Sequence, residues 1–282
     1  MARVRSFLQL RGSIGETTFK QVGKKNYAQD KVVINKDKIR NDKQYTTLRK
    51  NGKQMGNASK SARAIRDSLY LVAGYCKDPT MSNRLNAELR NIVKQDSSDT
   101  IVKYGKIARS ENMHLLQGFD FNDKVRLRST FNVFYNTDVN RETGEVTVNI
   151  ASFKPAWAIK SPHLATKYRI MAHVAEIDFN PAVLFMHKFQ AIGGYFTDYL
   201  TIDTTPTEPL TIKFKIKPGN VNTIFIALGV HFNDLSNPLY ENAALSKRVS
   251  SGGIVAVDEG VTVPLKGSSA KKIVAGSKDM KV

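Results

Sequence analysis

The stretch TIFIALGVHF, residues 223–232, constrains the fold most strongly because its apolar residues alternate with a period of two. The alternating residues are Ile224, Ile226, Leu228, Val230 and Phe232. A period of two is typical of a β-strand, and it predicts one buried face and one wetted face, as in antiparallel sheets.

Several further stretches toward the C-terminus have the character of strands. Alternation also runs from Leu127 to Tyr135 and from Leu210 to Ile216. The shorter candidates, separated by loops rich in Asn, Asp, Pro and Gly, are Val146–Ile150, Lys167–Phe179, Phe185–Gln190, Tyr195–Ile202 and Ile254–Glu259. With about eight strands and no clear helical stretch between them, residues 118–265 are predicted to form one antiparallel β-sandwich, immunoglobulin-like or similar.

A helical period replaces the strand period between residues 42 and 95. The steps of three, four and seven that mark one helix face connect Leu48, Met55, Ala58, Ala62, Ile65, Leu69, Val72 and Cys76. Asn41 or Asp42 is expected to cap the start of this helix. Gly52 and Gly56 predict either a close backbone approach or a break. A second helix is predicted over 81–95, with Leu85, Leu89, Ile92 and Val93 facing inward.

The N-terminal residues 1–41 are predicted to be extended. Thr17–Val22 and Asn26–Gln29 flank Gly23-Lys24-Lys25, and a three-residue loop that contains glycine is a common hairpin connection. An isolated hairpin is marginally stable in water, so this one needs support from the rest of the chain or from another subunit.

These patterns together predict an α+β protein with four parts. Residues 1–41 form a basic hairpin arm, 42–117 a helical segment, 118–265 the β-sandwich domain, and 266–282 a basic, flexible tail. No internal repeat is apparent.

The charge of the chain is segregated at its two ends. Residues 1–70 hold 17 Lys and Arg against five Asp and Glu, a net charge of +12, and the tail 266–282 contributes +4 of the total of +18. The 195 residues between them carry a net charge of only +2. Such asymmetry predicts a polyanion or an acidic protein surface as a partner, although a merely solvated surface is the simpler alternative.

The sequence contains no apolar run long enough for a transmembrane segment and no signal-peptide core. Cys76 is the only cysteine, which excludes disulfides within the chain. We therefore expect no membrane partner and a cytoplasmic location, or a place within a particle assembled inside a cell.

No motif for catalysis or cofactor binding is present, and we predict neither an enzyme nor a bound metal or cofactor. The histidines lack metal-ligand spacing, and His173 and His231 are interpreted as structural. Cys76 is interpreted as a packed thiol because it lies on the apolar helix face. Residues 136–144 resemble a calcium loop, but Arg141 stands where an EF-hand needs glycine, so a hairpin loop is favoured.

Four sequence motifs together resemble an uncharacterised family found in Bacteroidota genomes and their phages. They are RGSIGETTF near the start, GFDFN at 118–122, SFKPAW at 152–157 and SPHLATKYRIMAHVAEIDF at 161–179. The resemblance spans most of the chain, although Glu16 stands where a second glycine often follows Gly15. It implies the same order of hairpin, helices and β domain, and it implies no activity or catalytic residues.

The leading functional hypothesis is a non-enzymatic assembly subunit of a repeated intracellular or phage-type particle, a homo-oligomer or larger assembly joined through its basic hairpin. The alternative is a protein that binds nucleic acid without sequence specificity, since Phe7, Phe19, Tyr27 and Tyr45 are interleaved with basic residues. Both hypotheses assign binding of the partner or polyanion to Arg3, Arg5, Arg11, Lys20, Lys24, Lys25, Lys31, Lys36, Lys38 and Arg40.

Overall fold

The computed structural model describes residues 2–4, 11–23, 25–31, 36–95, 110–161, 165–179, 189–232 and 250–259. The chain divides into two compact units, Met1–Asn51 and Gly52–Val282. Both units contain antiparallel sheets together with helical segments, so the α+β class is confirmed. No helix among the described residues is long and apolar enough to cross a membrane.

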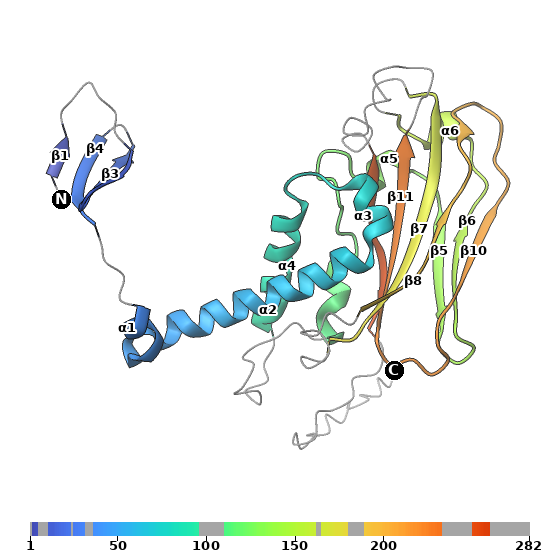
Figure 1. Ribbon diagram of the computed structural model, residues 1–282. Helices are drawn as coiled ribbons and strands as arrows, with labels where there is room; N and C mark the ends of the chain where they lie inside the picture. Colours follow the sequence, from blue (N-terminus) through green and yellow to red (C-terminus); the bar gives the residue numbers. More distant parts are fainter. Residues whose placement is uncertain are drawn as a thin grey trace, which may run out of the picture. The chain divides into compact units, whose positions relative to one another are not determined.

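The smaller unit contains the predicted hairpin. Strand β3 (Thr17–Val22) pairs antiparallel with β4 (Lys25–Asp30), and Gly23 between them adopts a positive φ of 61°, which glycine takes without steric cost. The short strands β1 (Ala2–Val4) and β2 (Gly12–Ile14) extend the hairpin to a sheet in the order β1-β4-β3-β2 (Figure 1). Helix α1 (Lys36–Asn41) and the 3₁₀ turn η1 (Lys43–Tyr45) follow.

Two antiparallel sheets form the β part of the larger unit (Figure 1). One has the order β12-β11-β7-β8, made of Ser251–Asp258, Thr223–Phe232, Lys167–Ile177 and Phe189–Phe196, and β9 (Leu200–Thr201) also pairs with β7. The other has the order β10-β6-β5, made of Leu210–Lys215, Glu145–Ile150 and Tyr135–Asn140.

The two sheets share one hydrophobic cluster, which includes Val148 of β6, Phe214 of β10 and Ile226 of β11. In β10 the predicted alternation is confirmed, since Ile212 and Phe214 are buried while Lys213 and Lys215 are exposed. Removing this apolar surface from water is what holds the sheets together.

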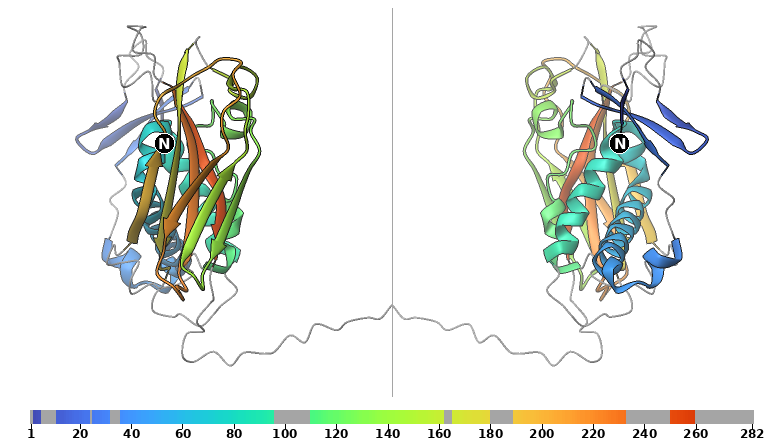
Figure 2. Two further views of the ribbon diagram at one scale, coloured as in Figure 1. Left: turned by 90° about the vertical axis from the view of Figure 1, so that its right-hand side faces the viewer. Right: turned by 90° about the vertical axis from the view of Figure 1, so that its left-hand side faces the viewer.

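Strand β11 departs from the expected pattern because all of its residues are buried. The prediction of a wetted face is therefore wrong for this strand. Ile224, Ile226 and Leu228 belong to the cluster between the sheets, whereas Phe225 and Ala227 belong to a second cluster shared with the helices. Figure 2 shows these helices on the face of the larger sheet that lies away from the smaller sheet.

The predicted first helix is divided in two. Helix α2 (Thr46–Ser68) ends before Leu69, whose φ of −95° and ψ of 26° depart from helical geometry, and α3 (Tyr70–Cys76) follows. Asp42 caps η1 rather than a long helix, since its side chain accepts a hydrogen bond from the Gln44 backbone N–H at 2.9 Å. The break turns α3 onto the sheet, where Val72 and Cys76 are fully buried.

The first half of α2 does not pack as predicted. Leu48 and Met55 were expected inward, but they are 55% and 57% exposed. Gly52 and Gly56 mark neither a break nor a close approach, because a Cβ atom at either position would meet open space. The buried residues of α2 begin only at Asn57 and Ala58.

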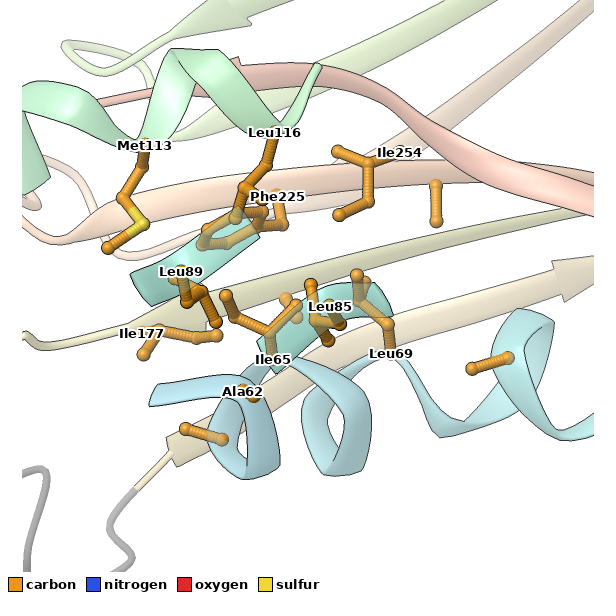
Figure 3. Packing of buried hydrophobic residues seen from close by; sticks show 14 of the residues in the cluster. Ala62, Ile65, Leu69, Leu85, Leu89, Met113, Leu116, Ile177, Phe225 and Ile254 are labelled. Atoms are coloured by element: carbon orange, nitrogen blue, oxygen red, sulfur yellow. The ribbon is translucent and has the colours of Figure 1, made fainter. Parts of the chain in front are cut away.

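The second helix, α4 (Met81–Gln95), is confirmed with its predicted residues, and Leu85, Leu89, Ile92 and Val93 are buried. Figure 3 shows Leu85 and Leu89 beside Ile65 and close to Phe225 of the sheet. The 3₁₀ segment η2 (Ser110–Leu116) contributes Met113 and Leu116 to the same cluster.

Helix α3 lies against three glycines from three different strands. A Cβ atom added to Gly194 of β8 would come within 2.6 Å of the Leu71 side chain, and one added to Gly229 of β11 within 2.8 Å of Val72. At Gly252 of β12 it would come within 2.7 Å of Val72 and 2.9 Å of the Cys76 sulfur. The absence of side chains at these positions is what allows the helix to approach the sheet so closely.

Two of the predicted strands, at 127–135 and 195–202, are not continuous strands in the structure. Residues 127–130 form a short helix, α5 (Leu127–Thr130), whose first N–H donates to the Asp120 carboxylate at 2.8 Å, and strand structure begins only at Tyr135. The candidate strand 195–202 is interrupted after Phe196 and resumes as β9. Most of the candidate strand 185–190 and the whole tail 266–282 lie outside the described residues. The short helix α6 (Pro155–Ala158) lies between β6 and β7 in the chain.

The glycine contacts predict a specific stability effect. Gly252→Ala should lower the free energy of unfolding by about 1–3 kcal/mol, because the new methyl group overpacks Val72 and Cys76. Urea denaturation followed by circular dichroism measures this change. Gly56→Ala is the matched control, and it should stabilise the protein by about 0.5–1 kcal/mol because the site is open and helical. Equal stabilities of the Gly252→Ala and wild-type proteins would contradict the close approach.

Candidate interaction surface

The register of the N-terminal sheet places the lysines of the hairpin on the face opposite Phe19. Lys20 pairs with Tyr27 and Val22 pairs with Lys25, whereas Phe19 pairs with Ala28. Since neighbouring positions of a strand point to opposite faces, Lys20, Lys25 and Tyr27 share one face and Phe19 and Ala28 share the other. Both lysines are accessible, and neither forms an ion pair with a described residue.

The structure brings some of the ten predicted binding residues together. Arg3 pairs with Tyr27 in register, and Arg11 lies next to β2, where its guanidinium donates a hydrogen bond to the Gln21 side chain. Lys31 follows β4 and is exposed, and its backbone N–H donates to the Glu16 carbonyl at 2.5 Å. Lys36, Lys38 and Arg40 are exposed on α1. Arg5 and Lys24 lie outside the described residues.

A basic residue that the sequence analysis did not select holds the end of α1. The Arg49 guanidinium donates to the Ile39 and Asp42 carbonyls at 2.8 and 2.7 Å and to the Thr46 hydroxyl at 3.1 Å. These carbonyls lie at the C-terminal end of α1, where a positive charge is favourable. Arg49 therefore organises this part of the chain and is half-buried, in contrast to the exposed Lys43, Lys50 and Lys53 nearby.

The calcium-like segment 136–144 is the predicted hairpin between β5 and β6. The Asn140 side chain accepts the backbone N–H groups of Glu142 and Thr143, both at 3.0 Å, so it is occupied in forming the turn. Arg141 pairs with Asp258 at 2.6 Å and donates to the carbonyls of Asn220 and Asn222. Arg141, which departs from the calcium-loop pattern, thus links the smaller sheet to the ends of β11 and β12. Among the residues that the structure describes, no three His, Cys, Asp or Glu side chains gather as metal ligands.

His231 and His173 are buried within the sheet beneath α3, as expected of structural histidines. A ring nitrogen of His231, Nδ1, lies 2.7 Å from the Ser250 hydroxyl, and its ring packs on Tyr75. Burial and the nearby Arg169 charge lower the pKa of His231 to about 4, and burial also lowers the pKa of His173. Both side chains are thereby held neutral.

Arg169, opposite His231 in the register, is enclosed by aromatic rings. Its guanidinium carbon lies 4.8, 4.4 and 5.1 Å from the ring centroids of Tyr75, Phe196 and Tyr199. Cation–π attraction of this kind compensates a charge that is partly removed from water. The cluster joins α3 to β7 and β8.

The Cys76 thiol is fully buried and donates a hydrogen bond to the Ser251 carbonyl at 3.1 Å. Burial raises the pKa of this thiol far above its ordinary value, which removes the reactive thiolate. The predicted packed cysteine is confirmed.

A scan of the sequence against protein-family models finds no match, and a search of curated proteins finds none. These comparisons assign the chain to no family, so the resemblance to the Bacteroidota and phage family rests on the sequence motifs alone.

The buried His231 predicts a pH-dependent stability. Its pKa of about 4 in the folded protein lies below the ordinary 6.5, so the unfolded chain takes up the proton first, and stability is lost as the pH falls from 6.5 toward 4. The loss from this group should be on the order of 2–3 kcal/mol. Urea denaturation at pH 7, 5.5 and 4.5 should show a smaller decline for His231→Gln than for the wild type, and parallel declines would contradict the assignment.

Proposed function

We propose that the protein is a non-enzymatic structural subunit of a repeated intracellular or phage-type particle, and that its N-terminal sheet joins neighbouring subunits. In this proposal the two facing sheets of the larger unit form a β-sandwich body. The sheet of strands β1 to β4 is the connector.

The observation that carries the proposal is that no residue described between 11 and 51 is buried. A small sheet gains its stability by burying one face, and on this one Ile14, which shares the face of Phe19, is 65% exposed. Its apolar face, with Phe19 and Ala28, suits a neighbouring subunit, and its short outer strands β1 and β2 leave backbone groups for strand addition.

The distribution of charge supports the same proposal. The first 70 residues carry a net charge of +12, while the region between them and the tail carries +2. A surface that serves solubility alone mixes both signs, whereas charge gathered at one end favours an acidic neighbour.

One observation favours the alternative of non-specific nucleic-acid binding. Tyr27 shares a face with Lys20 and Lys25, so an aromatic ring lies among cations on an accessible sheet. A base can stack on such a ring while the lysines neutralise phosphates. The two functions are compatible, because particle proteins often contact both their neighbours and packaged nucleic acid.

Charge reversal on the connector predicts a loss of assembly. The full-length variant Lys20→Glu/Lys25→Glu should self-associate at least about tenfold more weakly than the wild type, because like charges then face the acidic neighbour. Light scattering coupled to size exclusion at low salt measures the species formed. Lys160→Glu/Lys217→Glu is the matched control, since it makes the same charge change at exposed positions outside the N-terminal unit. If the Lys20→Glu/Lys25→Glu variant assembles as well as this control, the proposal is wrong.

The alternative predicts binding of single-stranded DNA that weakens steeply with salt. Tyr27→Ala should lower the affinity by about 1–3 kcal/mol through the loss of stacking while leaving the salt dependence unchanged. Fluorescence anisotropy with a labelled oligothymidine between 50 and 200 mM salt measures both quantities. An affinity that Tyr27→Ala leaves unaltered excludes stacking on this face.

A further inference from the structure

The larger unit has an acidic groove where the two sheets come together at their edges. β8 and β10 are edge strands of their sheets, and the groove, of about 570 Å³, follows the chain from the end of β8 through β9 to the start of β10. We name it the acidic groove because, of the residues that the structure describes, Asp198, Asp203 and Glu208 line it and no basic residue does.

The three carboxylates have no counter-charge. All three are exposed, and none forms an ion pair with any residue that the structure describes. Their gathering is notable in a chain of net charge +18, where basic side chains outnumber acidic ones by 43 to 25. Three uncompensated charges at one site attract a cation and repel a phosphate.

The wall of the groove holds an unsatisfied polar group. Tyr168 is fully buried, and its hydroxyl has no hydrogen-bond partner. Tyr168 and Asp203 line the same groove, and burial together with the negative charge of Asp203 raises the pKa of this hydroxyl. An unpaired buried hydroxyl costs free energy, and a donor brought into the groove would recover it.

Apolar side chains line part of the groove. Phe153, Ile170 and Pro206 contribute to its lining. Asp203 is itself held in place, since its side chain accepts the Thr205 N–H at 2.9 Å and its carbonyl accepts the Ala156 N–H at 2.8 Å. Such a wall suits the aliphatic stem of lysine or arginine, whose charged end then reaches the carboxylates.

We infer that the acidic groove receives basic side chains from the N-terminal sheet of a second copy of this chain. This inference rests on the proposed function and names the acidic neighbour that it requires. Residues 1–41 carry ten basic and three acidic residues, so they complement the three carboxylates in sign. An entering ammonium or guanidinium group pairs with the carboxylates and donates to the Tyr168 hydroxyl.

A charge exchange in the full-length protein tests the inference. The groove variant Asp198→Lys/Glu208→Lys and the connector variant Lys20→Glu/Lys25→Glu should each weaken self-association at least tenfold. Mixing the two variants should restore assembly between them, because the altered groove then meets the altered connector. Sedimentation velocity at low and high salt measures the species formed. Asp138→Lys/Glu142→Lys is the control, since it adds the same charge at exposed carboxylates outside the groove.

The outcomes separate the inference from the proposed function. Loss of assembly in both variants, recovery on mixing and an unaffected control support the inference. If the connector variant fails to assemble while the groove variant assembles as well as its control, the connector is retained and the acidic groove is not its receptor. A wild-type protein that stays monomeric at every salt concentration overturns both. Isosteric Asp198→Asn/Asp203→Asn/Glu208→Gln, which should also weaken assembly, guards against misfolding of the lysine variants.

Discussion

The close contact between α3 and the larger sheet is the interaction on which the rest of the body depends. Gly194, Gly229 and Gly252 remove side chains where Leu71, Val72 and Cys76 must lie. Because the helix can then approach closely, Phe225 and Ala227 of β11 are covered on one face while Ile224 and Ile226 are covered on the other. Strand β11, which would otherwise have one face in contact with water, is therefore covered on both faces within the larger unit.

The same contact decides the chemistry of the groups beneath it. His231 and Cys76 both lie where α3 meets the sheet, and burial there keeps the imidazole neutral and the thiol protonated. The guanidinium of Arg169 lies among three aromatic rings, which attract its charge by cation–π interactions. Titratable groups that would suggest a reactive site in the sequence therefore serve packing in the structure, which is consistent with a structural role.

Two surfaces of the chain present charges of opposite sign. The N-terminal sheet presents Lys20 and Lys25 beside Tyr27, and the acidic groove presents three carboxylates without partners. By contrast, Asp258 of the larger unit pairs with Arg141 at 2.6 Å. In the proposed assembly, these charges of opposite sign on two surfaces of one chain attract identical copies to one another.

Much of the local structure could be predicted from the sequence because it depends on periodicity and turn chemistry. The hairpin around Gly23, the helix 81–95 and the strands at β10 and β11 follow from residues within one stretch of chain. The predicted burial of Leu48 and Met55 was wrong for one reason. A helical period predicts which residues share a face, but not whether a neighbouring element covers that face. The strand prediction for residues 127–130 was wrong because the Asp120 carboxylate stabilises a helical turn there, which alternation alone cannot reveal.

The sequence by itself determined the class of elements, the segregation of positive charge and the lack of recognised catalytic motifs, because these are properties of composition and spacing. Only the tertiary structure decided that Asp198, Asp203 and Glu208 would line one groove with Tyr168, and that three glycines from separate strands would receive one helix. The reason is physical: strand pairing brings together residues far apart along the chain, and no local pattern records which side chains will meet.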